Sequence, residues 1–159
     1  MRQVSLFVFA ASSMLACSCF PEGPKRELVG AGAVFRGTVS NVVELPSRPD
    51  MPRGRYAVTF LVSEYWKGSS SREVTIHIAD PGTDCIGALF DKGKEYVVFA
   101  VSQSAIDYFL EDKFWYGWRD VLPAGTRFLT VNNFCDSTAE AKRAGGTLRA
   151  LGKGNRPHP

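Results

Sequence analysis

Five segments of this 159-residue chain alternate apolar and polar residues with a period of two, which is the spacing of half-buried β-strands. They are residues 33–45, 56–66, 72–79, 94–102 and 126–131. The fourth segment is the most apolar, so we expect it to be the central strand. The alternation therefore predicts a mainly β protein.

Gly37 lies inside the first of these segments, where a glycine is typical of a bulge or a bend in a curling sheet. Five short, mostly antiparallel strands with such a bend favour a small barrel, because closure removes the exposed edges of a sheet. We therefore expect a five-stranded barrel of the oligonucleotide/oligosaccharide-binding (OB) type. A β-sandwich is the alternative.

The ends of the chain are predicted from local signals. Proline and glycine are expected to keep residues 17–27 extended. Ser137 and Glu140 have the spacing of a capping box, which predicts a C-terminal helix that begins there and stops at Gly152. Residues 153–159 are expected to be a disordered tail.

A hydrophobic leader opens the sequence. Arg2 is followed by an uncharged, mostly apolar run that ends at Ala16. This run is typical of a secretory signal peptide and is shorter than the ~20 apolar residues of a membrane-spanning helix. We expect residues 1–16 to be removed, with cleavage after Ala10 as the alternative, so that residues 17–152 form one secreted domain.

Export makes the four cysteines, Cys17, Cys19, Cys85 and Cys135, candidates for disulfide bonds, because thiols oxidise outside the cytosol. Four cysteines allow three pairings. A bond between Cys17 and Cys19 would close a very small, strained ring. We therefore expect each of these two to pair with a distant cysteine.

Charge and motifs indicate a binding protein rather than an enzyme. The formal net charge is +3 and the basic residues are scattered, so nucleic acid is not indicated. We expect His77 on the solvent face of an edge strand rather than in a Ser-His-Asp triad. The carboxylates Asp107, Glu111 and Asp112 are expected to be solvated rather than to bind a cation. We expect a monomer without a cofactor or a metal of its own.

Residues 103–125, between the fourth and fifth strands, form an unusually aromatic insertion. Its candidate partner-contact residues are Tyr108, Phe114, Trp115 and Trp118. Exposed aromatic side chains often mark contact surfaces, but the same side chains could cover one mouth of the barrel. Both interpretations stay open.

The segment from Cys17 to Pro21, CSCFP, resembles the Cys-x-Cys-x-Pro start of the tissue inhibitors of metalloproteinases. Residues 31–39 and 85–100 are similar to two further segments of that family, and Cys135 stands where a bridging cysteine falls. The chain thus resembles the netrin-like (NTR) module, an OB-type barrel shared by these inhibitors and by non-inhibitory extracellular proteins. The cysteines of a third bridge are missing and the aromatic insertion has no clear counterpart, which favours a stand-alone relative.

The resemblance implies the disulfide pairs Cys17–Cys85 and Cys19–Cys135 and the inhibition of zinc metalloendopeptidases. In that role, the α-amine and carbonyl oxygen of Cys17 would chelate the catalytic zinc of the target and displace its water. Ser18 would face the specificity pocket, and Phe20 and Pro21 would lie along the substrate groove.

Two alternatives remain. The chain could be a non-inhibitory NTR module that binds its partner through the aromatic residues 108–118. It could also be a bacterial cell-envelope lipoprotein, because residues 14–17, MLAC, approximate a lipobox. Lipid on the sulfur of Cys17 would exclude its disulfide bond, and acylation of its amine would exclude zinc chelation.

Overall fold

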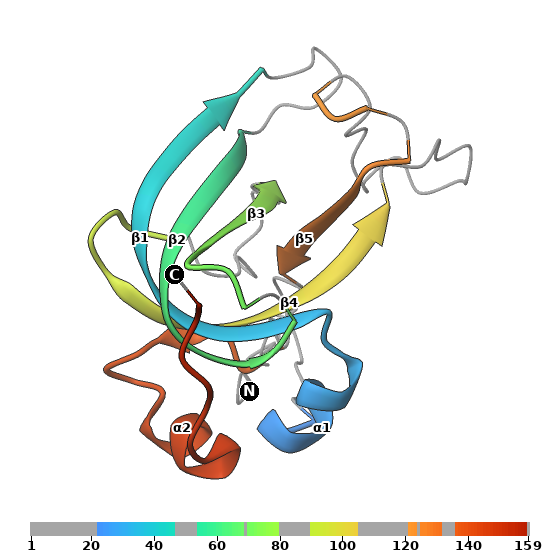
Figure 1. The fold of residues 1–159 in the computed structure, drawn as a ribbon. Coiled ribbons are helices and arrows are strands. Elements are labelled where there is room, and N and C mark those ends of the chain that lie inside the picture. The colour runs from blue at the N-terminus through green and yellow to red at the C-terminus, as the bar shows by residue number, and fades with distance from the viewer. Residues whose placement is uncertain are drawn as a thin grey trace, which may run out of the picture.

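The computed structural model describes residues 22–46, 54–68, 70–79, 90–104, 121–123, 125–131 and 136–158. Their elements are α1 (Pro24–Gly30), β1 (Ala33–Leu45), β2 (Arg55–Lys67), β3 (Glu73–Ala79), β4 (Glu95–Ser104), β5 (Arg127–Val131), β6 (Ala139–Glu140) and α2 (Gly145–Leu151). All five predicted strands are present, with ends within two residues of those expected. Figure 1 shows the strands curving around a common interior, with α1 and α2 together at one end.

Five of the strands close into a barrel in the order β1-β2-β3-β5-β4, and β4 returns to pair with β1. The neighbours are antiparallel except β3 and β5, which run parallel and meet at a single residue pair, Ile76 and Leu129. The short strand β6 adds to β4 outside this ring. The closed mixed barrel confirms the prediction of an OB-type fold over a sandwich.

Strand β1 pairs with both β2 and β4 because it bends. One of its register shifts against β2 falls between Arg36 and Gly37. A Cβ atom at residue 37 would lie 3.0 Å from the carbonyl oxygen of Leu61 and 3.2 Å from Cβ of Phe60. The glycine thus permits the close approach of β2, and the predicted irregularity at Gly37 is confirmed.

The barrel interior is filled by an aromatic cluster centred on Phe60. Its ring meets the rings of Phe35, Phe90 and Tyr96 at centroid distances of 5.3, 5.1 and 6.5 Å and in edge-to-face orientation. This orientation places the positive edge of one ring against the negative face of the next. All four side chains are buried, together with inward-facing valines and isoleucines of β1 to β4.

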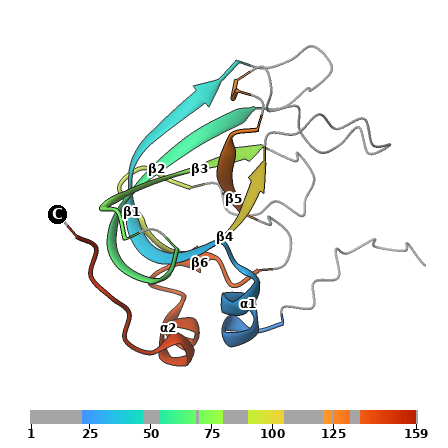
Figure 2. The ribbon, with the colours of Figure 1, turned by 45° about the vertical axis from the view of Figure 1, so that its right-hand side comes forward.

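A second apolar cluster lies outside the barrel wall. Val34 of β1 and Val97 and Phe99 of β4 are buried beneath α1, α2 and β6. The side chains that cover them include Leu28, Ala31, Ala139, Ala144, Leu148 and Leu151. Figure 2 shows the two helices side by side against this end of the barrel.

The N-terminal part of the described chain differs from the expected extended segment, because α1 begins at Pro24. Proline suits the first turn of a helix, where its missing N–H has no intrahelical acceptor. At the other end of α1, Nζ of Lys67 donates to the carbonyl oxygens of Leu28 at 3.1 Å and Val29 at 2.6 Å. A seven-residue helix depends on such tertiary contacts, which the sequence pattern does not reveal.

The predicted capping box does not form. The C-terminal helix begins at Gly145 rather than near Ser137, and it has no side-chain cap at its N-terminus. Residues 139 and 140 pair with β4 as β6 instead. Pairing with the open edge of β4 thus prevails over the local helix signal. The helix ends before Gly152, as predicted.

Residues 152–158, which we call the C-terminal strap, lie along β2. Asn155 and Tyr65 exchange two backbone hydrogen bonds of 2.8 Å each, and Gly154 donates its N–H to the carboxylate of Glu64 at 2.6 Å. The described residues 153–158 therefore differ from the disordered tail that was expected. The docking depends on the bare backbone of Gly154, since a Cβ atom there would lie 2.7 Å from Cγ of Glu64.

Candidate functional site

Most residues that the sequence singled out lie outside the described part of the chain. These are the predicted signal peptide (1–16), Cys17, Ser18, Cys19, Phe20, Pro21, Cys85, Asp107, Tyr108, Glu111, Asp112, Phe114, Trp115, Trp118 and Cys135. The two disulfide bonds, the N-terminal binding segment and the aromatic contact residues therefore stay predictions. The described residues nevertheless bring together segments that adjoin some of them.

The chain that follows Cys19 meets the chain that follows Cys135. Ser137, two residues after Cys135, donates its backbone N–H to Oε2 of Glu27 in α1 at 2.6 Å. The next residue, Thr138, accepts a hydrogen bond of 2.9 Å from the backbone N–H of Phe99 in β4. Helix α1 and the segment that leads to β6 are thus fastened to the same end of the barrel.

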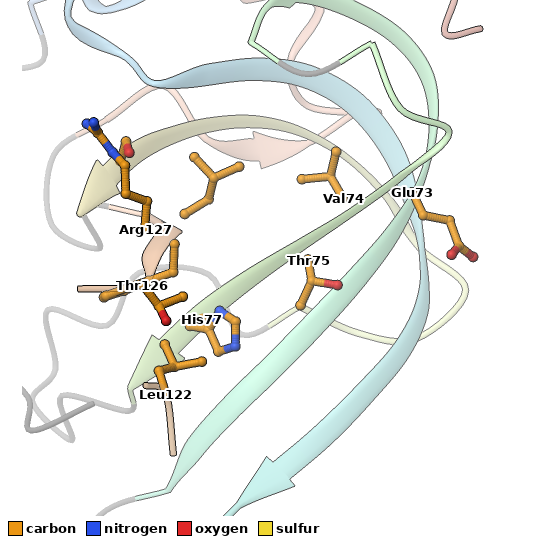
Figure 3. Close-up of a pocket in the computed structure, with 10 residues that line it drawn as sticks. Glu73, Val74, Thr75, His77, Leu122, Thr126 and Arg127 are labelled. Carbon is orange, nitrogen blue, oxygen red and sulfur yellow. The ribbon is translucent and has the colours of Figure 1, made fainter. Parts of the chain in front are cut away.

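A groove opens on the outer side of the barrel, where β3 runs beside β5, and has a volume of about 440 Å³. Its apolar lining consists of Val74, Leu122, Phe128 and Leu129. Its polar lining consists of Glu73, Thr75, His77, Ser102, Thr126 and Arg127. Figure 3 shows the β3 residues Thr75 and His77 across from Leu122 and Thr126. We call this the β3–β5 groove.

The period of two along β3 explains why Thr75 and His77 lie on the outer face of the barrel, beside the groove. In β3, Val74, Ile76 and Ile78 are buried in the barrel core, which leaves Thr75 and His77 on the outer face. Because β3 and β5 share only one residue pair, the two strands are free to separate on either side of it. The groove is the space that this sparse pairing leaves.

His77 is half-buried in the groove wall. Its ring meets the ring of Phe128 edge to face at a centroid distance of 5.8 Å. Burial lowers the pKa of His77 from its ordinary value of 6.5, because the imidazolium would lose hydration there. His77 is on the outer face as expected, but the expected edge strand is wrong, since β3 lies between β2 and β5 in the closed ring.

Two charged residues mark the ends of the groove. Figure 3 shows Arg127 at one end and Glu73 at the other, with the Glu73 carboxylate directed away from the remaining lining residues. Both residues are exposed. Neither side chain forms an ion pair with any part of the described chain. The Arg127 side chain runs outward at its end of the groove (Figure 3).

Within the described ranges, no three or more His, Cys, Asp or Glu side chains gather as they would around a metal ion. None of the helices in these ranges has the length and apolar character needed to cross a membrane.

The sequence matches no protein-family model, and no curated protein is significantly similar to it. The likeness to the NTR module thus rests on the motif residues quoted above, and the structure adds to it the five-stranded mixed barrel. Sequence reasoning singled out His77 but missed the other lining residues of the β3–β5 groove. Thr75, Ser102 and Arg127 belong to three different strands, so no spacing along the chain could have indicated that they meet.

Proposed function

We propose that this protein is a secreted, monomeric binding module whose N-terminal segment is fastened to an OB-type barrel and contacts a protein partner. The hydrogen bond between Ser137 and Glu27 is the observation that best supports this proposal. It joins Glu27, eight residues after Cys19, to Ser137, two residues after Cys135, which is compatible with a disulfide bond between these two cysteines. By the resemblance, Cys17 would then pair with Cys85.

The contacts of α1 support a rigid origin for the N-terminal segment. Glu27 links the first turn of the helix to Ser137, and Lys67 holds its C-terminal carbonyl groups. A binding segment that leaves a fixed helix loses less conformational entropy on docking than one on a loose tether.

The partner that we propose is a zinc metalloendopeptidase. An α-amine has a pKa of about 7.7–8.0, so that a useful fraction is neutral at neutral pH and has a free lone pair. The amine and carbonyl oxygen of Cys17 would occupy the open coordination position of the zinc and displace the water that attacks the substrate. Ser18, Phe20 and Pro21 would contact the target beside the metal.

Two measurements test this proposal. Intact-mass analysis with and without reduction and alkylation should show a mature chain that starts at Cys17 and carries four oxidised thiols. An added N-terminal Ala should abolish inhibition of a panel of zinc endopeptidases, because it removes the amine from the chelating position. Lys25→Gln, at an exposed position of α1, is the control and should leave inhibition unchanged.

A chain that starts at Ala11 or carries a diacylglycerol mass would overturn the N-terminal mechanism, and the second result would establish the lipoprotein alternative. Unchanged inhibition by the Ala-extended protein would refute chelation by the amine.

The second candidate function is partner binding through the aromatic insertion. Val121 and Leu122, which end this stretch in the sequence, pack against Phe128 of β5. The insertion is therefore anchored to the barrel at this end. If it makes the contact, replacing Trp115 and Trp118 with Ala should abolish partner capture, whereas replacing Ser18 should change little. The reverse pattern would favour the N-terminal segment.

A further inference from the structure

We propose that the β3–β5 groove is a binding site for a small aromatic monocarboxylate, separate from the contact made by the N-terminal segment. The site combines an apolar, partly aromatic wall with several hydroxyl groups and a guanidinium that no carboxylate of the described residues pairs with. Size, lining and charge each restrict the class of ligand.

The size of the groove suits a small molecule. Ligand pockets typically measure about 300–1,000 Å³, and the β3–β5 groove, at about 440 Å³, falls at the lower end of this range. Its wall carries the ring of Phe128 and the side chains of Leu122 and Leu129. The rings of His77 and Phe128 meet at an interplanar angle of 81° and form an aromatic corner. A flat apolar body can pack into such a corner, whereas a fully hydrated sugar would leave the wall without polar partners.

The charged residues of the groove favour a ligand that carries a single negative group. Arg127 presents a planar guanidinium that no carboxylate of the described chain occupies, and this geometry matches a carboxylate through two parallel hydrogen bonds. Ser102 and Thr126 supply hydroxyl groups in the same lining. Since burial lowers the pKa of His77 and so favours its neutral form, Arg127 is the one cation among the lining residues that the structure describes.

Glu73, at the end of the groove opposite Arg127, further restricts the charge of the ligand. Its exposed carboxylate is directed away from the lining, but it keeps a negative charge at this end of the groove, so that a second negative group on the ligand is weakly disfavoured. This disfavours dianions such as phosphate esters and polyanions such as nucleic acid. The ligand class is therefore a monoanion with its charge at the Arg127 end and its apolar body towards Phe128 and Leu122.

The test uses phenylacetate as probe, with phenylacetamide and phenyl phosphate as matched comparisons, on the mature, oxidised full chain. Titration followed by amide NMR should shift the signals of Thr75, His77 and Phe128, with a dissociation constant in the millimolar range or below, as expected for so few atoms. Phenylacetamide and phenyl phosphate should bind more weakly than phenylacetate.

Arg127→Gln should weaken phenylacetate binding by about tenfold or more, the loss expected for a charge-assisted bidentate contact. Arg127 is exposed, so this variant should keep the fold, which the unperturbed spectrum outside the groove would verify. Thr75→Trp, at an exposed position of the groove wall, should fill the site and abolish binding. Arg149→Gln in α2 is the matched control and should bind as the wild type does.

The proposal is overturned if phenylacetate shifts no groove signal at millimolar concentration, or if Arg127→Gln binds it as tightly as Arg149→Gln does. Equal binding of phenyl phosphate would overturn the selection for a monoanion. An added N-terminal Ala should leave phenylacetate binding intact, so failure of the protease proposal would not be mistaken for failure of this one.

Discussion

His77 carries an ionisable ring into a position where burial disfavours its charged form. Above a pH of about 6.5, the ring is neutral in both the folded and the unfolded chain, and it contributes no pH dependence. As the pH falls below this value, the unfolded chain takes up a proton that the folded chain resists. The free energy of unfolding should therefore fall as the pH drops below about 6.5, until the folded chain takes up the proton as well.

His77→Gln should flatten this fall, as measured by urea unfolding at a series of pH values. Arg127 and Glu73 line the same groove and are present in both proteins, so their effect cancels in the comparison. His158→Gln, at an exposed position of the C-terminal strap, should reproduce the wild-type profile. Identical profiles for His77→Gln and wild type would contradict the assigned role of burial.

Two glycines should respond in opposite directions to the same substitution. Gly37→Ala would place a methyl group 3.0 Å from a β2 carbonyl oxygen, and should lower the free energy of unfolding by about 1–3 kcal/mol. Gly146→Ala meets nothing within 4 Å in α2 and should raise it by about 0.5–1 kcal/mol. Thermal and urea unfolding of the two variants would check both signs, and equal effects would contradict the close packing of β1 on β2.

At the level of elements, α1 is held by contacts rather than by its own propensity. Lys67→Met removes the two hydrogen bonds to the carbonyl oxygens of Leu28 and Val29. Amide hydrogen exchange in residues 24–30 should become faster, while exchange in β2 stays near the wild-type rate. Lys153→Met, at an exposed site of the C-terminal strap, is the control. Unchanged protection of α1 would show that its packing alone is sufficient.

The elements also show how far the sequence could be interpreted. The five barrel strands were predictable because each carries its own period of two, and Gly37 marked the bend. The C-terminal helix was predicted together with its end at Gly152, but its start, α1 and the C-terminal strap were not. Ser137 and Glu140 have the spacing of a helix start, but this segment pairs with β4 as β6 instead. The partners that hold α1 and the C-terminal strap lie more than 30 positions away in the chain. Such long-range contacts leave no local pattern.

At the level of the whole molecule, the aromatic cluster around Phe60 joins β1, β2 and β4 in one core. Phe60→Ala should lower the free energy of unfolding by about 3–5 kcal/mol, a large share of the 5–15 kcal/mol typical of a domain. Leu61→Ala, the next residue but on the exposed face, should cost far less. Calorimetry of both variants would check this, and similar losses would contradict the inward orientation of Phe60.

In the ring of strands, β3 and β5 have the weakest connection, because they pair only at Ile76 and Leu129. On heating, neighbouring strands should separate first where they share the fewest residue pairs, so transient opening of the barrel should begin between β3 and β5. A small molecule bound between β3 and β5 would stabilise the closed barrel, and its binding would raise the melting temperature by mass action. Binding in the β3–β5 groove would then also determine the lifetime of the closed barrel.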